Sequence, residues 1–325
     1  MRLTLIQGIR TIVTRTLLLS AAAYLVSCQS PPAATPEKRP SDFSGAARLR
    51  NGQILFVHDA KPNKDRAGVP PIRAGVVNPK TGLVRNVEIQ WPASGVSSDL
   101  EAVCTLPGTG DILLCESGYY VDSKLHQEPQ YGRIFRCRPR WSLQGLSSLK
   151  VIDVWHWPKL LPNGELTKDI EGVACVKAGR RHLLIAAVRT GAVFYAPISL
   201  SQAGQQLRFG NGGEPIVDIE RDPRFSFLQE FNRKVSDLTL NSQGELCASA
   251  AFEDSDYGPF KSAIYKLGSL TRHPKAVIRF APAPTKARMD GYKVEAMAST
   301  KNNQLFVGTD DEEVGGTWRV IPEPR

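Results

Sequence analysis

The chain has 325 residues, of which 42% are hydrophobic and 22% are charged. This composition excludes an intrinsically disordered protein and allows a packed core. The net charge is +9, from 41 lysine and arginine residues against 32 aspartate and glutamate residues. The surplus is spread along the chain without a long basic run, so we do not expect a nucleic-acid partner.

Residues 1–27 have the pattern of a secretory signal peptide, with a basic start followed by about a dozen apolar residues. This apolar run is too short to span a membrane, which takes about 20 residues. The run ends in Leu25-Val26-Ser27-Cys28, which resembles the bacterial lipobox. The resemblance implies that Cys28 is lipidated and becomes the new N-terminus. The alternative is an ordinary signal peptide with a cysteine nearby.

Residues 28–42 are rich in proline and lack aromatic residues up to position 42, so they are expected to form an extended tether. Acyl chains on Cys28 would hold the protein at a lipid membrane without a spanning helix. The expected location is therefore the cell envelope, and Gln29 in place of aspartate favours the outer membrane. Apart from the membrane, the expected partner is a small molecule or an envelope protein that the sequence does not identify.

From residue 43 to residue 325, one unit recurs five times at intervals of about 60 residues. Each unit begins with a small or acidic residue, continues through a turn such as Asn-Gly or Gln-Gly, and contains short apolar runs rich in Val, Ile, Phe and Tyr. These runs predict β-strands. The residues that align at the start of the units are Ser44, Glu101, Glu171, Asp237 and Glu295.

Four antiparallel strands in each unit predict an all-β fold, a β-propeller whose blades are four-stranded. One such blade has two apolar faces, and stacking the blades around an axis buries both of them. Five blades are expected from the five repeats. Six blades remain an alternative, because the long segments between units could contain further strands.

Five cysteines, Cys104, Cys115, Cys137, Cys175 and Cys247, follow Cys28. They lack the close Cys and His spacing of zinc sites. Cys115 and Cys247 lie within apolar runs, which favours small buried thiols. The alternative is a disulfide between Cys104 and Cys115 in an oxidising compartment.

The first strand of each propeller blade lines the central channel, so the aligned residues should face one space. Four of them are acidic: Glu101, Glu171, Asp237 and Glu295. Crowded carboxylates either take up protons or bind a cation. An oxygen-rich site suits Ca²⁺ better than zinc. Alternatively, these side chains accept hydrogen bonds from the backbone N–H groups of the next blade.

A second polar set follows the second strand of most units and is expected to form a rim around the channel. It offers a base in His58, a cation for an anionic ligand in Arg189, and three further carboxylates. The alternative is that these are solvated turn residues. The set consists of His58, Asp59, Glu116, Arg189 and Asp310.

The repeats at residues 99–103, 169–174 and 294–298 resemble the D-x-E-G-φ phrase (φ is an apolar residue) of the esterase-like phytases and related bacterial propellers. The calcium-dependent apyrases are a more distant resemblance. These resemblances imply a propeller over residues 43–321, and some of these relatives are calcium-dependent phosphoesterases. By analogy, the four acidic residues at the unit starts would surround a cation. Ser44 departs from that acidic pattern.

We therefore expect a membrane-anchored extracytoplasmic lipoprotein whose propeller binds a ligand or partner at a central, acid-lined site, with Ca²⁺ as its cofactor. The alternative is a calcium-dependent phosphoester or ester hydrolase. In that case Glu101, Glu171 and Glu295 would hold the metal and Arg189 would contact the anionic substrate. A third hypothesis is a purely structural part of an envelope complex.

Overall fold

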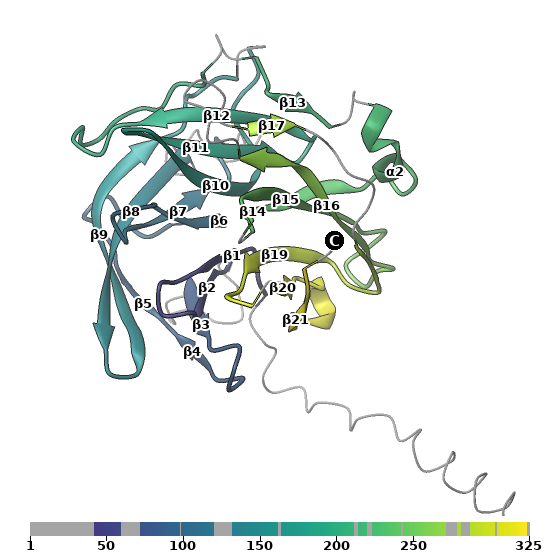
Figure 1. Ribbon diagram of the computed structural model, residues 1–325, viewed down its shortest axis with the longest axis horizontal. Helices are drawn as coiled ribbons and strands as arrows, with labels where there is room; N and C mark the ends of the chain where they lie inside the picture. The colour runs from purple at the N-terminus through teal and green to yellow at the C-terminus, as the bar shows by residue number, and fades with distance from the viewer. Residues whose placement is uncertain are drawn as a thin grey trace, which may run out of the picture. The chain divides into compact units, whose positions relative to one another are not determined.

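Short apolar runs, separated by turns, form the strands of a five-bladed β-propeller in a computed structural model (Figure 1). The predicted signal peptide, Cys28 and the predicted tether up to residue 41 lie outside the described residues. Within the part that is described, no helix is long and apolar enough to cross a membrane. The structure describes residues 42–59, 72–97, 99–119, 132–161, 164–210, 214–219, 223–241, 243–270, 278–280, 287–302 and 304–323.

The first three blades follow the expected antiparallel plan, with one extra strand in the second. Blade 1 contains β1 (Gly45–Arg48), β2 (Ile54–Val57), β3 (Ala74–Val77) and β4 (Val84–Asn86). Blade 2 contains β6 (Leu100–Thr105), β7 (Ile112–Glu116), β8 (Arg133–Ser142) and β9 (Gly145–His156), and β5 (Glu88–Gln90) pairs with β9 in parallel. Blade 3 contains β10 (Ile170–Ala178), β11 (Arg181–Val188), β12 (Ala192–Ile198) and β13 (Val217–Asp218).

Blade 4 has one strand more than the expected four, and blade 5 has one fewer among the described residues. Blade 4 contains β14 (Lys234–Leu240), β15 (Glu245–Phe252), β16 (Lys261–Leu270) and β17 (Ile278–Phe280), and β18 (Ala287–Asp290) also pairs with β16. Blade 5 contains β19 (Val294–Ser299), β20 (Gln304–Thr309) and β21 (Trp318–Pro322) among the described residues. Short helices are η4 (Pro223–Phe225), α2 (Ser226–Gln229) and η5 (Glu312–Val314).

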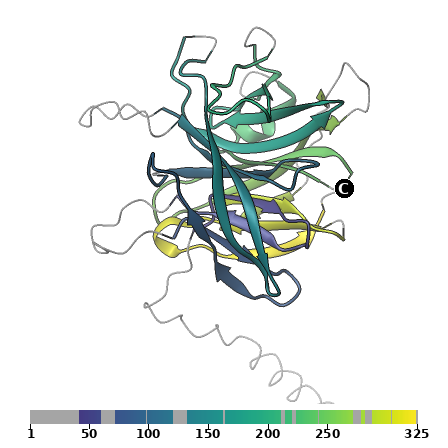
Figure 2. The ribbon, with the colours of Figure 1, turned by 90° about the vertical axis from the view of Figure 1, so that its left-hand side faces the viewer.

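Strand length explains the extra pairing. The hairpin of β8 and β9 is longer than the other strands of blade 2 and extends beyond them (Figure 2). β9 therefore has an edge that β8 does not use, and β5 pairs with it through residues 88–90. In the same way, β16 is long enough to pair with β17 near one end and with β18 near the other.

The first strands of the blades, β1, β6, β10, β14 and β19, form a closed ring in which each contacts the next and β19 contacts β1. In Figure 1 they surround a common centre, with the outer strands around them. The ring is tight enough to require glycine: a Cβ atom on Gly172 in β10 would lie 2.4 Å from the backbone nitrogen of Leu238 in β14. The ring confirms the predicted propeller and its five blades.

The hydrophobic core lies between neighbouring blades rather than in one central mass. One cluster joins blades 2 and 3 through residues such as Leu113 and Leu184, and another joins blades 1 and 5 through Phe56 and Phe306. Second strands are buried on both faces; every residue of β2 is buried, for example. Their nearly continuous apolar sequences reflect this two-sided covering.

The five described cysteines are buried, free thiols. Cys104 lies opposite Leu113 and Cys115 lies opposite Ala102 in the pairing of β6 with β7. The two thiols are therefore offset along the strands instead of facing each other as a directly opposed pair. This places them in the apolar layer between blades 2 and 3, where burial raises the pKa of both.

Candidate functional site

A β-bulge at the start of four inner strands places one extra residue at the same end of the channel. In β6, Leu100 pairs with Glu116 and Ala102 pairs with Cys115, so Glu101 has no partner across the ladder. Because a bulge re-aims the extra side chain, the four bulged residues form a set together with Ser44, which directly precedes β1. The set is Ser44, Glu101, Glu171, Ser236 and Glu295.

The bulge corrects the alignment of the fourth repeat by one residue. Val235 pairs with Ala250 and Asp237 pairs with Ser249, so the equivalent of Glu101 is Ser236. The Ser236 hydroxyl donates a hydrogen bond to the carbonyl of Val294 at 2.6 Å. A serine in place of an acid lowers the number of carboxylates on the ring.

Asp237 instead points into the ring of inner strands, where only 1% of it is exposed. Its carboxylate accepts hydrogen bonds from the backbone N–H groups of Leu238 (2.7 Å) and Met297 (2.5 Å), and also from Ala46. Burial raises the pKa of this carboxyl group, and the hydrogen bonds oppose that shift. Asp237 thereby links β14, β19 and β1, which is the backbone-binding arrangement that the sequence left open as an alternative.

The ends of the second strands contribute to the same end of the channel, and their side chains alternate in direction. Asp59, Arg189 and Asp310 occupy equivalent positions. Each stands two residues after the second-strand residue that pairs with the aligned inner-strand glycine or alanine, and these second-strand residues are Val57, Ala187 and Gly308. We call the side chains gathered at this end the acidic mouth. It comprises Asp59, Asp99, Glu101, Glu171, Arg189, Lys293, Glu295 and Asp310.

His58 and Glu116 lie one residue earlier and point between the blades. His58 is 3% exposed and donates from Nδ1 to the carbonyl of Asp42; burial lowers its pKa to about 4, so the ring is neutral at pH 7. Glu116 is 0% exposed and pairs with Arg133 at 2.8 Å. Arg133 in turn donates to carbonyls of the loop at residues 94–96. Both predicted rim residues are therefore buried away from the acidic mouth.

Three carboxylates of blades 1 and 2 form the tightest acidic group. One oxygen from each of Asp59, Asp99 and Glu101 lies within 4.8 Å of the others. Burial raises the pKa of Glu101 well above its usual range, and the nearby carboxylates add to the shift. Arg73 interacts electrostatically with Asp59 and Asp99. Such a group can bind a cation or retain protons.

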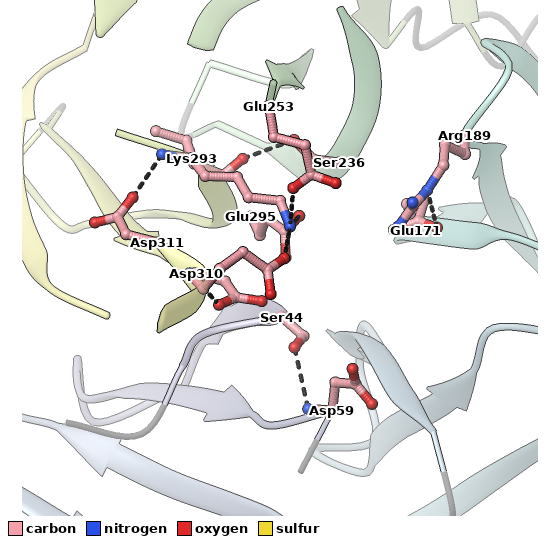
Figure 3. A network of polar contacts seen from close by, with 12 residues as sticks. Ser44, Asp59, Glu171, Arg189, Ser236, Glu253, Lys293, Glu295, Asp310 and Asp311 are labelled. Atoms are coloured by element: carbon pink, nitrogen blue, oxygen red, sulfur yellow. Dashed lines mark hydrogen bonds and ion pairs between the residues drawn. The ribbon is translucent and has the colours of Figure 1, made fainter. Parts of the chain in front are cut away.

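Glu171 has a different environment, because Arg189 follows the second strand of the same blade. Arg189 Nε donates to Glu171 at 2.9 Å (Figure 3). Burial raises the pKa of Glu171 and the guanidinium opposes the shift, while Glu171 raises the pKa of Arg189. Glu171 is thus held as the anion of an ion pair.

Glu295 is part of a cluster around Lys293. The Lys293 ammonium lies 3.1 Å from Glu295 and 2.7 Å from Glu253 (Figure 3). It also contacts Glu312. Burial alone would lower the Lys293 pKa, but these carboxylates raise it above its usual range. Burial raises the pKa of Glu295 well above its usual range and also raises that of Asp310, while the Lys293 ammonium opposes both shifts.

A cavity of about 210 Å³ opens at the mouth between blades 3, 4 and 5. Its wall alternates acceptors with donors, and Phe252 and Val235 add apolar surface. The charged and polar residues of the wall are Glu171, Arg189, Asn232, Lys234, Ser236, Glu253, Lys293 and Glu295. This composition suits a small ligand with several hydrogen-bonding groups.

The structure thus brings Glu101, Asp59, Glu171, Arg189, Glu295 and Asp310 to one end of the channel and places Asp237, His58 and Glu116 elsewhere. Two members of the acidic mouth were missing from the predicted set. Asp99 stands two residues before Glu101, and that spacing on a strand was the available signal. Lys293 stands two residues before Glu295, as Lys234 stands two residues before Ser236 in the fourth repeat, whereas the second and third repeats have Asp99 and Asp169 at this position.

No family model matches the chain, and no curated protein matches it. Among solved structures, it is similar to a member of the GH130 family, whose glycoside hydrolases target β-1,2-mannosidic linkages in Candida mannan. That match has 12% identity and a TM-score of 0.48, and it covers 91% of this chain and 93% of the other. A glycoside hydrolase-like protein from Parabacteroides distasonis matches with 12% identity and a TM-score of 0.45, and the match covers 91% of this chain and 96% of the other. A glucose dehydrogenase matches with 12% identity and a TM-score of 0.40, and the match covers 89% of this chain and 85% of the other. We take neither a family nor an activity from similarities at this level.

Proposed function

We propose that this protein binds a small polar ligand together with a divalent cation at the acidic mouth of its propeller, and that the cation is Ca²⁺. The observation that carries this proposal is the group formed by Asp59, Asp99 and Glu101, whose oxygens lie within 4.8 Å of one another. Carboxylate oxygens are the ligands that Ca²⁺ prefers. The loop positions of Asp59 and Asp99 leave room for the oxygens to adjust, which suits the flexible coordination of this ion.

The charges at the group support a divalent ion over a monovalent one. Three carboxylates carry three negative charges when ionised, and Arg73 offsets one of them. A divalent cation would offset the remaining two. Ca²⁺ takes about six to eight oxygen ligands, so three carboxylates leave coordination positions for water or for oxygens of the ligand.

The ligand would occupy the neighbouring cavity of about 210 Å³. That volume is below the usual range of about 300–1,000 Å³ for drug-sized ligands, so the part that enters is small. Glu171 and Glu295 would accept hydrogen bonds from it, and Arg189 and Lys293 would donate them. A compact molecule with several hydroxyl groups satisfies both kinds of partner.

Metal-dependent hydrolysis of a phosphoester or carboxylic ester is a second candidate. It is favoured by the unlike environments of two acids in one cavity: Glu171 is paired with Arg189, whereas burial raises the pKa of Glu295 well above its usual range. Such a pair can supply a base and an acid. A bound cation would polarise the substrate oxygen and lower the pKa of a water molecule.

We also propose that lipid on Cys28 holds the propeller at the cell envelope, because the residues before it have the pattern of a lipoprotein signal. A Cys28→Ser variant should move from the membrane fraction to the soluble fraction, whereas Cys247→Ser should not. Unchanged membrane association of the Cys28 variant would contradict this part of the proposal.

Calorimetric titration of the purified protein with CaCl₂ tests the cation site. We expect one saturable binding event that is lost in Asp99→Asn and retained in Asp254→Asn, an exposed acid outside the mouth. Absence of binding by the wild-type chain, or equal binding by both variants, would refute the cation site. Release of phosphate or acid from an ester panel, abolished by chelator and by Glu171→Gln, would separate the hydrolase from the binding protein.

A further inference from the structure

A second cavity adjoins the acidic mouth between blades 3 and 4. It has a volume of about 340 Å³ and shares Arg189, Asn232 and Val235 with the mouth cavity. Its other walls come from the turn after β11, from β13 and its extension, and from the short helices η4 and α2. They are formed by Thr190, Gly191, Ile219, Phe225, Leu228, Gln229 and Arg233. We call it the blade 3–4 cavity.

The two cavities differ in charge. Three acidic and three basic side chains line the mouth cavity. The blade 3–4 cavity has two guanidinium groups, Arg189 and Arg233, and no acidic side chain in its wall among the residues that the structure describes. An anion is therefore favoured in the blade 3–4 cavity over the mouth cavity.

Arg233 strengthens this preference because it is charged and mostly removed from water, with 7% of its surface exposed. Burial lowers the pKa of its guanidinium, and the like charge of Arg288 lowers it further, while Glu230 and Asp290 act in the opposite direction. Its Cζ atom lies 4.9 Å from the centre of the Phe231 ring. Its guanidinium forms part of the cavity wall, where it can donate hydrogen bonds to a ligand anion.

Arg189 presents a second guanidinium to the same space. Its ion pair with Glu171 uses Nε, which is one of five N–H donors on the group. The side chain is 47% exposed, so solvent and ligand can reach it. A guanidinium matches a carboxylate geometrically, because two parallel N–H donors can contact its two oxygens.

Four apolar side chains form much of the remaining wall, alongside the uncharged polar residues Thr190, Gln229 and Asn232. Ile219, Phe225, Leu228 and Val235 are each buried and belong to the hydrophobic cluster between blades 3 and 4. Apolar walls with a few convergent polar groups are typical of small-molecule sites, and about 340 Å³ lies within their usual range. The wall would exclude a highly hydrated anion and accept one with an apolar body.

From these observations we infer that the blade 3–4 cavity binds a small carboxylic acid whose remaining part is apolar. Its carboxylate contacts Arg189 and Arg233, and its apolar body packs against Phe225 and Leu228. This site goes beyond the proposed cation and polar-ligand site, and neither depends on the other.

Titration calorimetry with benzoate, benzamide and acetate tests the inference on the full chain. Benzoate combines both features, benzamide lacks the charge, and acetate lacks the apolar body. Because hydrogen bonds between a guanidinium and a carboxylate are stronger than those to a neutral amide, we expect benzoate to bind at least about tenfold more tightly than benzamide. Equal affinity for the three probes, or no binding of benzoate, would overturn the proposal.

Variants locate the site. Arg233→Gln and Arg189→Gln should each weaken benzoate binding about tenfold or more, whereas Arg180→Gln, in an exposed turn, should not change it. If Arg233→Gln does not fold, methyl NMR of the wild-type chain replaces it. Benzoate should then shift the Leu228 and Val235 methyl signals, and unshifted signals would refute the site.

Calcium titrations separate this inference from the proposed function. Arg233→Gln should retain calcium binding, and Asp99→Asn should retain benzoate binding. Loss of benzoate binding in Asp99→Asn but not in Arg233→Gln would place the acid at the mouth and overturn the inference, whatever the result for calcium.

Discussion

The acidic mouth has two halves that use the same positions of the repeat in different ways. In blades 3 and 5, each bulged glutamate has a cation from its own blade: Arg189 for Glu171 and Lys293 for Glu295. In blade 2, the bulged Glu101 instead lies beside Asp59 and Asp99. The difference shows that a repeated backbone position defines where a carboxylate points, whereas its neighbours decide whether it forms an ion pair or is available to a cation.

Removing Lys293 from the paired half should cause the largest loss of folding stability. Lys293→Met would leave Glu295 and Glu253 without their buried cation, and such losses destabilise a protein by about 3–5 kcal/mol. Urea unfolding at pH 7 measures the change. Lys80→Met, at an exposed turn, is the matched control and should change stability by less than about 0.5 kcal/mol. A similar small effect of Lys293→Met would show that the cluster is not a structural ion pair.

His58 precedes Asp59 of the unpaired half but is buried between the blades, and it should make the fold sensitive to acid. Its pKa is about 4 in the folded chain and about 6.5 when unfolded, so the unfolded chain binds more protons between these values. Stability is therefore lost as pH falls from about 6.5 towards 4, by up to about 3 kcal/mol. The measurement is the difference in unfolding free energy between wild type and His58→Gln across this range. A difference that does not vary with pH would contradict the burial of a neutral imidazole.

The contribution of Glu101 to stability should depend on pH in the opposite direction to that of His58. Burial and neighbouring carboxylates raise its pKa in the folded chain, so the folded chain binds its proton more tightly than the unfolded chain does. Stability therefore falls as pH rises above about 4.3, the usual pKa of glutamate. Glu101→Gln should be more stable than wild type by about 1–2 kcal/mol at pH 8 without calcium, and saturating Ca²⁺ should reverse the order. Thermal unfolding of wild type and Glu101→Gln, with and without Ca²⁺, checks both orders of stability. If Glu101→Gln is less stable than wild type without Ca²⁺, the crowding of the acids is contradicted.

The smallest expected effect comes from converting the paired half into the unpaired one. Arg189→Gln removes the partner of Glu171, but Arg189 is 47% exposed, so the loss of stability should be about 1 kcal/mol or less. The pKa of Glu171 should rise, and NMR titration of its side chain would measure it. Arg180→Gln is the control and should leave the Glu171 titration unchanged. An unchanged titration in Arg189→Gln would show that the ion pair does not set the charge of Glu171.

Much of this arrangement was available in the sequence. Five repeats of short β-branched and aromatic runs predicted the blades. Aligning the repeats found Ser44 and three of the four bulged residues, Glu101, Glu171 and Glu295. The alignment failed in the fourth repeat, where Asp237 resembles the acids of the other units but Ser236 occupies their place. A bulge adds one residue, and side chains alternate along a strand, so an error of one residue reverses the side on which an acid lies.

The all-β propeller, its five blades and the end of the channel at which acids gather could be predicted from the amino-acid order, because they follow from local periodicity repeated along the chain. Which charges meet could not be predicted in this way, because it depends on how the blades pack. Glu101 and Asp59 come from different blades, and Lys293 reaches Glu253 across the boundary between blades 4 and 5. Distances between blades depend on how closely the inner strands approach, and that is fixed by packing around the ring, including the contact at Gly172.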